Sequence, residues 1–539
     1  MRIAGIAVLC GLFLATGCRN KSGSDDNTEP KGNLPADVQQ WVDKLGSKDD
    51  VGKALDALEK LNNPAAIPAL IEGWKKRQAD GQFLRAVIKL AHNAKAKTVV
   101  STTVPFFVSV AKSVMVKKPP SKNVDQAVKA IRVLRDVRTP AAHAALVDVC
   151  AFPAEYSYGQ RATIVACLSL ADRPGDASHK ALLTALNRGA RTKSANLAGA
   201  AARALGKRAE QRSLGPLCKG MYIAPKAFPS IREAILRMGP PTIPKMMAIF
   251  AGVDAEINKL AKAVKMTRPQ MMRQSALMLG DLYYGKAVPH LIESLKQPGM
   301  HHESVFIALT QIADATAAKH LLAYALNTKN KKKDRINAVG AYGVLAADGK
   351  ELPKLLAWLR REKDASVRNI VSLTSAQLVR SDRNFAALNA ALPKKNKVSR
   401  AAHAVASLGA LCGDDPDCYL LQVESLPKDL HLRLTKLKGF KLSAKQIAQI
   451  KAFMDVRSLT DVVKLRGKKK APLPTLLRIL ATATVAVHQQ LLYAIVHTAP
   501  RPCPKCVKRF DVLLARKSRV SAQVTQGLRM IRSYLSWAK

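Results

Sequence analysis

Two short patterns contain residues that bind metals or exchange electrons. Cys503-Pro-Lys-Cys506 is a C-x-x-C pair, which in other settings forms half of a zinc site or a redox dithiol. Zinc needs two further ligands, yet the sequence has no second C-x-x-C and the nearby His497 stands alone. His-His-Glu at residues 301–303 begins a predicted helix, where polar residues are ordinary. We therefore predict no metal and no cofactor, and we interpret Cys503 and Cys506 as a structural disulfide.

The first 18 residues resemble a bacterial lipoprotein signal. A basic start and the apolar run Ile3–Leu14 precede three small residues and Cys18, a pattern typical of an export signal. The resemblance implies cleavage before Cys18 and acylation of that cysteine, although the family usually has leucine where this chain has Ala15. By the family's sorting rule, Arg19 directly after the cysteine implies the outer membrane. We therefore expect an exported protein that is lipid-anchored in the cell envelope.

Cysteine usage fits an exported chain, because disulfides form in oxidising compartments. Cys412 and Cys418 enclose the short turn-forming loop GDDPD, which predicts a second disulfide. We expect the remaining unpaired cysteine to be buried Cys218 or one of Cys150 and Cys167. Motifs for covalent catalysis, phosphate loops, zinc proteases and dinucleotide binding do not occur in the sequence. We accordingly predict that the protein is not an enzyme.

The elements that must position these residues are helices. The chain has 48% hydrophobic residues but only 5% aromatic ones, which favours closely packed helices over a sandwich or barrel. Pairs of apolar runs at helical spacing, separated by Gly, Asp, Asn or Pro, recur along the sequence and begin near Asp50, Asn123, Asn196, Ser230, Met271, His302 and Asp334. One such hairpin cannot cover its own apolar face, so stacked copies would share a continuous core.

These hairpins resemble HEAT repeats, particularly the short Ala-rich kind known from phycobilin lyases. The resemblance is carried by Ala-Arg-Ala-Leu-Gly at Ala202–Gly206, by Pro-x-Leu at Pro289 and Pro353, and by recurring apolar-Arg pairs such as Ile231-Arg232. It implies an all-α solenoid, a superhelix of stacked hairpins. It implies almost nothing about activity, because motifs this short accompany many functions.

Composition and periodicity predict six segments. These are a signal peptide at 1–17, a flexible tether at 18–34, an N-terminal HEAT-like array at 35–250, an inserted helix and loop at 251–270, a second array at 271–427, and basic, divergent helical repeats at 428–539.

Recurring arginines have two interpretations. They form a cationic ladder along one face of the superhelix, or they pair with acidic residues of adjacent turns and fix the register of the repeats. The nearby Asp334 and Asp364 favour pairing. The residues concerned are Arg232, Arg273, Arg335, Arg368 and Arg400.

Charge is the strongest hint about partners. The chain carries 87 Lys and Arg against 39 Asp and Glu, a net charge of +48. From Lys464 to Lys539 we count sixteen basic residues and one acid, Asp511, so this segment is a candidate anion-binding surface, with solvated surface as the alternative. Few aromatic residues and no zinc finger argue against specific nucleic-acid binding. The candidate anion-binding residues are Lys468, Lys469, Lys470, Arg501, Lys505, Lys508 and Arg509.

Together these features predict a non-catalytic, lipid-anchored HEAT-repeat scaffold. Its predicted partners are a protein, an anionic envelope polymer or lipid head groups, and its predicted membrane contact is the lipid on Cys18. The alternative is a lyase-like enzyme with a pocket on the concave face of the solenoid, which converging acidic or histidine side chains would reveal.

Overall fold

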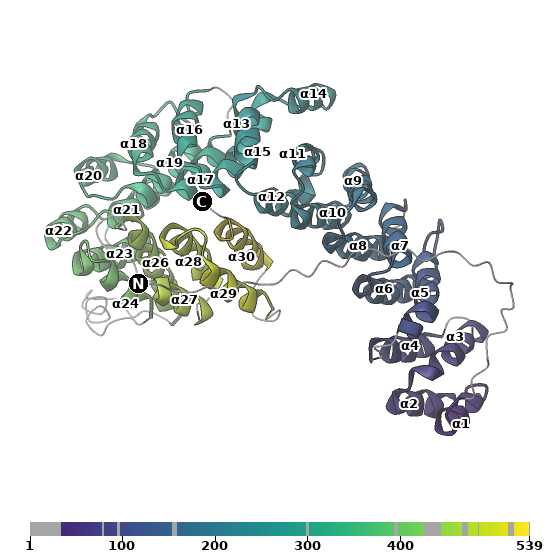
Figure 1. The fold of residues 1–539 in the computed structure, drawn as a ribbon. Coiled ribbons are helices and arrows are strands. Elements are labelled where there is room, and N and C mark those ends of the chain that lie inside the picture. Colours follow the sequence, from purple (N-terminus) through teal and green to yellow (C-terminus); the bar gives the residue numbers. More distant parts are fainter. Residues whose placement is uncertain are drawn as a thin grey trace, which may run out of the picture. The chain divides into compact units, whose positions relative to one another are not determined.

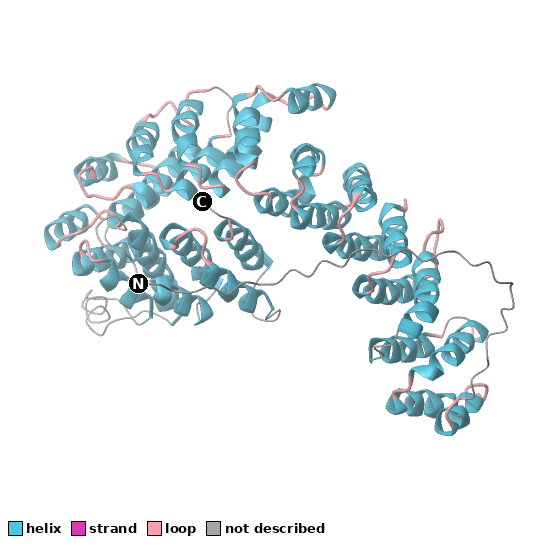
Figure 2. Cartoon of the chain, in the orientation of Figure 1, coloured by secondary structure: helices cyan, strands magenta, loops and turns pink. Residues whose placement is uncertain are grey.

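A computed structural model describes residues 34–77, 80–93, 97–153, 159–297, 301–392, 397–424, 444–465, 473–482, 485–515 and 522–537. Within these ranges every regular element is a helix and there is no strand (Figure 2). The predicted all-α solenoid of stacked hairpins is confirmed. By its internal contacts the chain divides into unit 1, residues 1–103, and unit 2, residues 104–539.

Unit 1 is a small stack of helices around a core that includes Leu55, Leu58, Leu70 and Phe83, all buried. Arg77 at the end of the third helix donates to three backbone carbonyls of residues 45–47, at 2.9 to 3.1 Å. The elements are α1 Ala36–Lys44, α2 Val51–Leu61, the 3₁₀ helix η1 Pro64–Ala66, α3 Ile67–Lys76 and α4 Gly81–Asn93, and α5 Lys97–Lys112 spans the boundary.

Unit 2 continues as helical hairpins to the end of the described chain. Its α-helices are α6 Ser121–Asp136, α7 Pro140–Ala151, α8 Gln160–Ser169, α9 Asp176–Arg191, α10 Ala195–Arg208, α11 Leu214–Ile223, α12 Phe228–Arg237, α13 Thr242–Ala251, α14 Ala255–Ala263, α15 Arg268–Asp281, α16 Val288–Ser294, α17 His302–Ile312, α18 Ala318–Leu326, α19 Lys332–Leu345, α20 Leu352–Arg361, α21 Ala365–Gln377, α22 Asp382–Ala391, α23 Lys397–Cys412, α24 Pro416–Glu424, α26 Ala444–Lys464, α27 Leu473–Thr482, α28 Val485–Thr498, α29 Pro504–Ala515 and α30 Ala522–Leu535. Its 3₁₀ helices are η2 Leu170–Asp172, η3 Gln211–Ser213, η4 Pro225–Ala227, η5 Gly285–Ala287 and η6 Ala315–Ala317.

Local sequence explains where these helices begin. Thr139 accepts a hydrogen bond from the Ala142 amide and caps α7, which has Pro140 as its first residue. Asp364 caps α21 by accepting from the amides of Ser366 and Val367. Such side chains satisfy amides that a helix start leaves unpaired, and proline is tolerated there because its missing N–H would have had no partner.

Small residues let neighbouring hairpins pack closely. In α10, Ala200, Ala201, Ala202 and Ala204 are fully buried. A Cβ on Gly206 would collide with the backbone of Ala234 in α12, so the two helices approach too closely for any larger residue at this position. The Ala-Arg-Ala-Leu-Gly motif is therefore a packing surface between successive repeats.

Alternate helices of unit 2 form an inner layer that closes on itself. Helices α15, α17, α19, α21, α23, α26, α28 and α30 each pack on the next, and α30 packs on α12 (Figure 1). We call α12–α30 the ring and the preceding hairpins α6–α11 the arc. Ring closure means that the inner ends of α15–α19 lie opposite α26 and α28.

Three contacts join distant parts of the ring. The Gln526 amide of α30 donates to the Pro229 carbonyl at 3.0 Å, and His497 of α28 lies 2.8 Å from the Gln311 carbonyl. The aromatic rings of Tyr283 and Tyr534 have centroids 4.6 Å apart. Residues separated by up to 297 positions in sequence are thus neighbours.

Candidate functional site

The described part of the basic C-terminal segment presents cations on helix α29. Lys505, Lys508 and Arg509 lie at positions i, i+3 and i+4 of this helix, a spacing that puts them on one side. Arg501 precedes the helix, and its guanidinium lies 4.6 Å from the centre of the Tyr534 ring. We call these four residues the α29 basic face.

Carboxylates do not neutralise the α29 basic face. Asp511, the acid of this segment, accepts hydrogen bonds from Arg532 at 2.5 and 3.0 Å, which lower its pKa. None of the four basic residues makes an ion pair with any part of the chain that the structure describes. Arg501, Lys505 and Lys508 are exposed, so their charges are available to an external anion.

A disulfide between Cys503 and Cys506 holds the start of α29 in place. Both cysteines are buried, and the Cys503 amide donates to the Leu535 carbonyl at the end of α30. The C-x-x-C pair therefore links the basic helix to the helix that closes the ring. Among the described residues, no group of three or more His, Cys, Asp or Glu side chains could hold a metal ion, so the C-x-x-C pair has no further ligands there.

The other described cysteines form two further disulfides and one free thiol. Cys412 is joined to Cys418 and Cys150 to Cys167, whereas Cys218 is a free, buried thiol. Burial raises the pKa of Cys218 to about 12, so its thiol is unreactive at neutral pH.

Four predicted site residues lie outside the described residues. They are the lipidation site Cys18 and the lysine run Lys468, Lys469 and Lys470. The lipid anchor and the contribution of that run stay predictions. No helix among the described residues is both long and apolar enough to cross a membrane.

Arg232 and Arg335 contact acidic residues, and in the case of Arg232 the acid belongs to a later repeat. Arg232 forms an ion pair with buried Asp281, and Arg335 lies 3.7 Å from Glu362 while also donating to the Ala325 carbonyl. The contact between Arg232 and Asp281 is of the kind that the pairing interpretation predicts, whereas the Arg335 contact lies within one hairpin. Of the other three, Arg273 is exposed, and Arg368 and Arg400 are half-buried.

Sequence reasoning missed a second set of arginines, which bind backbone carbonyl groups of the preceding repeat. Buried Arg173 donates to the carbonyls of Leu134, Arg135 and Val137 at the end of α6. Arg208 binds the Arg173 carbonyl in the same way one repeat later. A cation at a helix C-terminus is favourable because the last carbonyls are unpaired and carry partial negative charge. A signal was present, since Arg138, Arg173 and Arg208 recur at intervals of 35 residues.

A buried charge cluster, also unpredicted, lies inside the ring. Asp461 of α26 accepts hydrogen bonds from Arg457 at 2.8 Å and from Arg380 at 2.9 Å, and the Lys464 ammonium lies 3.4 Å away. Arg457 is nearly inaccessible to solvent and also donates to the carbonyls of Ala376, Val379 and Val405. The cluster therefore joins α26 to the ends of earlier repeats, and its cations hold the pKa of Asp461 well below its usual range.

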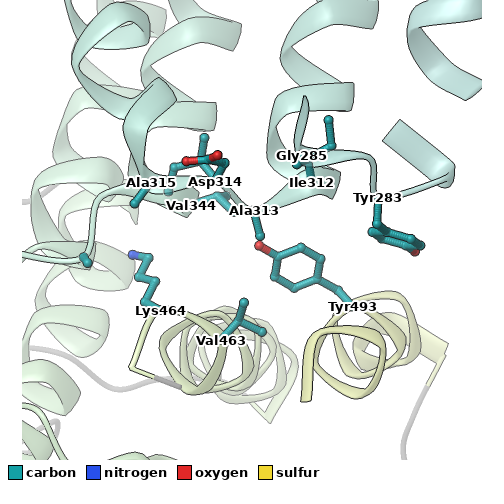
Figure 3. Close-up of a pocket in the computed structure, with 12 residues that line it drawn as sticks. Tyr283, Gly285, Ile312, Ala313, Asp314, Ala315, Val344, Val463, Lys464 and Tyr493 are labelled. Atoms are coloured by element: carbon teal, nitrogen blue, oxygen red, sulfur yellow. The ribbon is translucent and has the colours of Figure 1, made fainter. Parts of the chain in front are cut away.

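A pocket of about 450 Å³ lies beside this cluster, between two distant parts of the ring (Figure 3). Its upper wall consists of the loops after α15, α17 and α19. Its lower wall consists of α26 and α28, from which Lys464 and Tyr493 point upward (Figure 3). The His-His-Glu sequence at 301–303 lies elsewhere, where His302 contacts Asp334 at 3.2 Å and Glu303 contacts Lys333 at 2.9 Å.

No protein-family model and no curated protein matches the chain. Among solved structures, the chain is similar to a crystal structure of importin beta, with 13% sequence identity and a TM-score of 0.31. The alignment covers 92% of this chain and 76% of that one. Similarity at this level carries no information about function.

Proposed function

We propose that the protein is an exported, lipid-anchored, non-catalytic scaffold that binds an anionic polymer of the cell envelope through the α29 basic face. The observation that carries this proposal is the group of basic residues on and beside α29 that have no acidic partner among the residues that the structure describes. Stacked hairpins supply a long, stiff support for such a surface. A lipid on Cys18 would hold that support at the membrane where phosphate-rich polymers such as lipopolysaccharide are found.

Charge-driven binding has a characteristic dependence on salt. Exposed charge contacts weaken as ions screen them, and the loss is steep when several cations engage phosphates together. We expect full-length protein in mild detergent to bind lipopolysaccharide at least about tenfold more weakly at 200 mM salt than at 50 mM salt. Fluorescence anisotropy with labelled lipopolysaccharide would measure the change.

A triple variant, Lys505→Gln with Lys508→Gln and Arg509→Gln, tests the location of the site. The matched control replaces Lys226, Lys259 and Lys262 with Gln, which removes the same formal charge from exposed positions near α12 and α14. We expect the α29 variant to lose most of the salt-dependent affinity and the control to retain it. Equal losses in both variants would show that only net charge matters, and affinity indifferent to salt would refute the proposal.

The anchor requires its own test. Cys18→Ala should release the protein from the membrane pellet after a high-salt wash, because the remaining electrostatic contacts are screened. A variant that stayed in the pellet would show that lipid on Cys18 is not what holds the protein there.

A further inference from the structure

The pocket inside the ring contains a buried ammonium group with an unused donor. Lys464 has a side chain that is 3% exposed, and its three N–H donors would each need an acceptor. One donates to the Gly343 carbonyl at 2.6 Å and a second faces Asp461. The third has no acceptor among the described residues, and Lys464 lines the pocket. A buried donor without a partner is costly, so the pocket favours an occupant that accepts a hydrogen bond here.

The charged residues around Lys464 also favour an occupant with a negatively charged group. Arg380, Arg457 and Lys464 contribute three positive charges to the cluster. Asp461 supplies one buried carboxylate, and Asp414, at 3.7 Å from Arg380, supplies a second that is half exposed. Three cations against two carboxylates leave one positive charge uncompensated, which an anionic group at Lys464 would balance.

The upper wall of the same pocket contains a negatively charged residue. Asp314 lines it, and its Oδ1 accepts from the amide and the hydroxyl of Thr316 at 2.9 and 2.7 Å. Its other carboxylate oxygen has no partner within the described part of the chain, and no ion pair joins Asp314 to Lys464 there. Acidic and basic groups therefore lie on opposite walls without neutralising each other (Figure 3).

Between these walls the pocket has both polar and apolar surface. Ile312, Val344, Leu345 and Val463 contribute aliphatic surface, and Tyr283 and Tyr493 contribute aromatic rings. Pockets of roughly 300–1,000 Å³ that combine apolar side chains with a few directed polar groups are typical of small-molecule sites. Two opposite charges on facing walls, with aliphatic and tyrosine side chains beside them, match a molecule that carries both charges and an apolar side chain.

We propose that this pocket binds a small zwitterion of the α-amino acid class with an apolar side chain. The carboxylate of the ligand meets the Lys464 ammonium, its ammonium group meets Asp314, and its side chain lies against the aliphatic and tyrosine walls. The site is separate from the α29 basic face, so it stands whether or not the proposed polymer binding holds.

Calorimetric titration of the full-length protein in detergent with L-leucine and L-phenylalanine tests the proposal. N-acetyl-L-leucine lacks the ammonium group, and L-leucinamide lacks the carboxylate. We expect a parent amino acid to bind at least about tenfold more tightly than either derivative, because each has lost one charge-assisted contact. Binding of neither amino acid at millimolar concentration would overturn the proposal, as would equal affinity for N-acetyl-L-leucine, which would indicate a simple anion site.

Two variants locate the contacts. Asp314→Asn keeps an oxygen for the Thr316 hydrogen bonds but removes the charge, so it should fold normally and lose at least about tenfold in affinity for the amino acid. Lys464→Met should lose affinity to a similar extent, and thermal unfolding would show whether it stays folded. The control Lys354→Met alters an exposed lysine outside the pocket and should bind as the unaltered protein does. Unchanged affinity in Asp314→Asn would contradict the proposed orientation even if Lys464→Met failed to fold.

The pH dependence gives an independent readout. Burial lowers the pKa of Lys464 to about 8, with Arg380 and Arg457 lowering it and Asp461 opposing them. Asp314, Tyr283 and Tyr493 are the other titratable groups that line the pocket. Affinity for the amino acid should therefore fall as pH rises through about 8, when the ammonium loses its proton. Affinity that stayed constant from pH 7 to pH 9 would argue against a contact with Lys464.

Discussion

The arc and the ring are built from the same kind of hairpin but are held together differently. In the arc, Arg173 and Arg208 reach carbonyls 33 to 39 residues away, about one repeat. In the ring, the corresponding contacts to backbone carbonyls span far more sequence: 121 residues for Lys464, 186 residues for His497 and 297 residues for Gln526. The arc can add one repeat at a time, whereas the ring forms only when its distant ends meet.

The two regions also neutralise their positive charges differently. In the arc, buried Arg173 binds the partly negative carbonyls at the end of α6, and Arg208 binds the Arg173 carbonyl together with the Glu210 carboxylate. In the ring, Arg380, Arg457 and Lys464 gather around the buried carboxylate of Asp461, and Arg232 pairs with the buried carboxylate of Asp281. Losing one partner should therefore have a local effect in the arc and a cooperative effect in the ring.

The largest effect is expected from Asp461→Asn. This change leaves three buried cations without their central anion, and breaking a buried ion pair in this way costs about 3–5 kcal/mol of unfolding free energy. Hydrogen exchange should show lost protection in α26, α28 and α30, with α6 and α8 unaffected. Equal loss of protection in the arc and the ring would contradict the view that the two regions unfold separately.

The second prediction concerns pH and the stability of the ring. Lys464 has a pKa of about 8 in the folded state against 10.5 in the unfolded chain. Between these values the unfolded state binds more protons, so the unfolding free energy should rise with pH, by up to about 3 kcal/mol. Urea titrations from pH 7 to pH 10.5 should show this rise in the unaltered protein and in Lys354→Met but not in Lys464→Met. A rise that survived in Lys464→Met would belong to another group.

The disulfides of the arc and the ring close loops of different length, so their loss should destabilise the protein to different extents. Cys150 and Cys167 are 17 residues apart in the arc, and Cys503 and Cys506 are three apart in the ring. By loop-closure entropy, replacing both cysteines with alanine should cost roughly 3 kcal/mol in the arc and roughly 2 kcal/mol in the ring. Denaturant unfolding of the two double variants would measure this. A reversed order would mean that the short loop in the ring has a further role in holding α29 on α30.

The smallest effect is expected from Arg173→Met, which keeps the buried aliphatic stem but removes the hydrogen bonds to the end of α6. We expect a loss of roughly 1.5 kcal/mol, because the carbonyls of Leu134 and its neighbours lose their donor. Arg138→Met, at an exposed position with one carbonyl contact, is the matched control and should cost less. Hydrogen exchange should locate the change in α6–α8, and a change that reached α26 would show that arc and ring unfold together.

Much of the fold was predictable from local pattern. Helical spacing of apolar residues, proline at helix starts and alanine-rich faces determined the hairpins, because these features act within one or two turns of chain. The buried face of α10 at Ala200–Leu205 is an example. The Cys503 and Cys506 pair and the α29 basic face could likewise be named from spacing and composition alone.

Only the tertiary structure decided the closure of the ring and what it brings together. Arg380 and Asp461 are 81 residues apart, and Asp314 and Lys464 line one pocket from different arrays. No local periodicity relates such positions, since the curvature that makes them neighbours accumulates from small rotations over many repeats. The sequence by itself determined the hairpins and the excess of charge, and the accumulated rotation decided which charges are buried, paired or left facing a pocket.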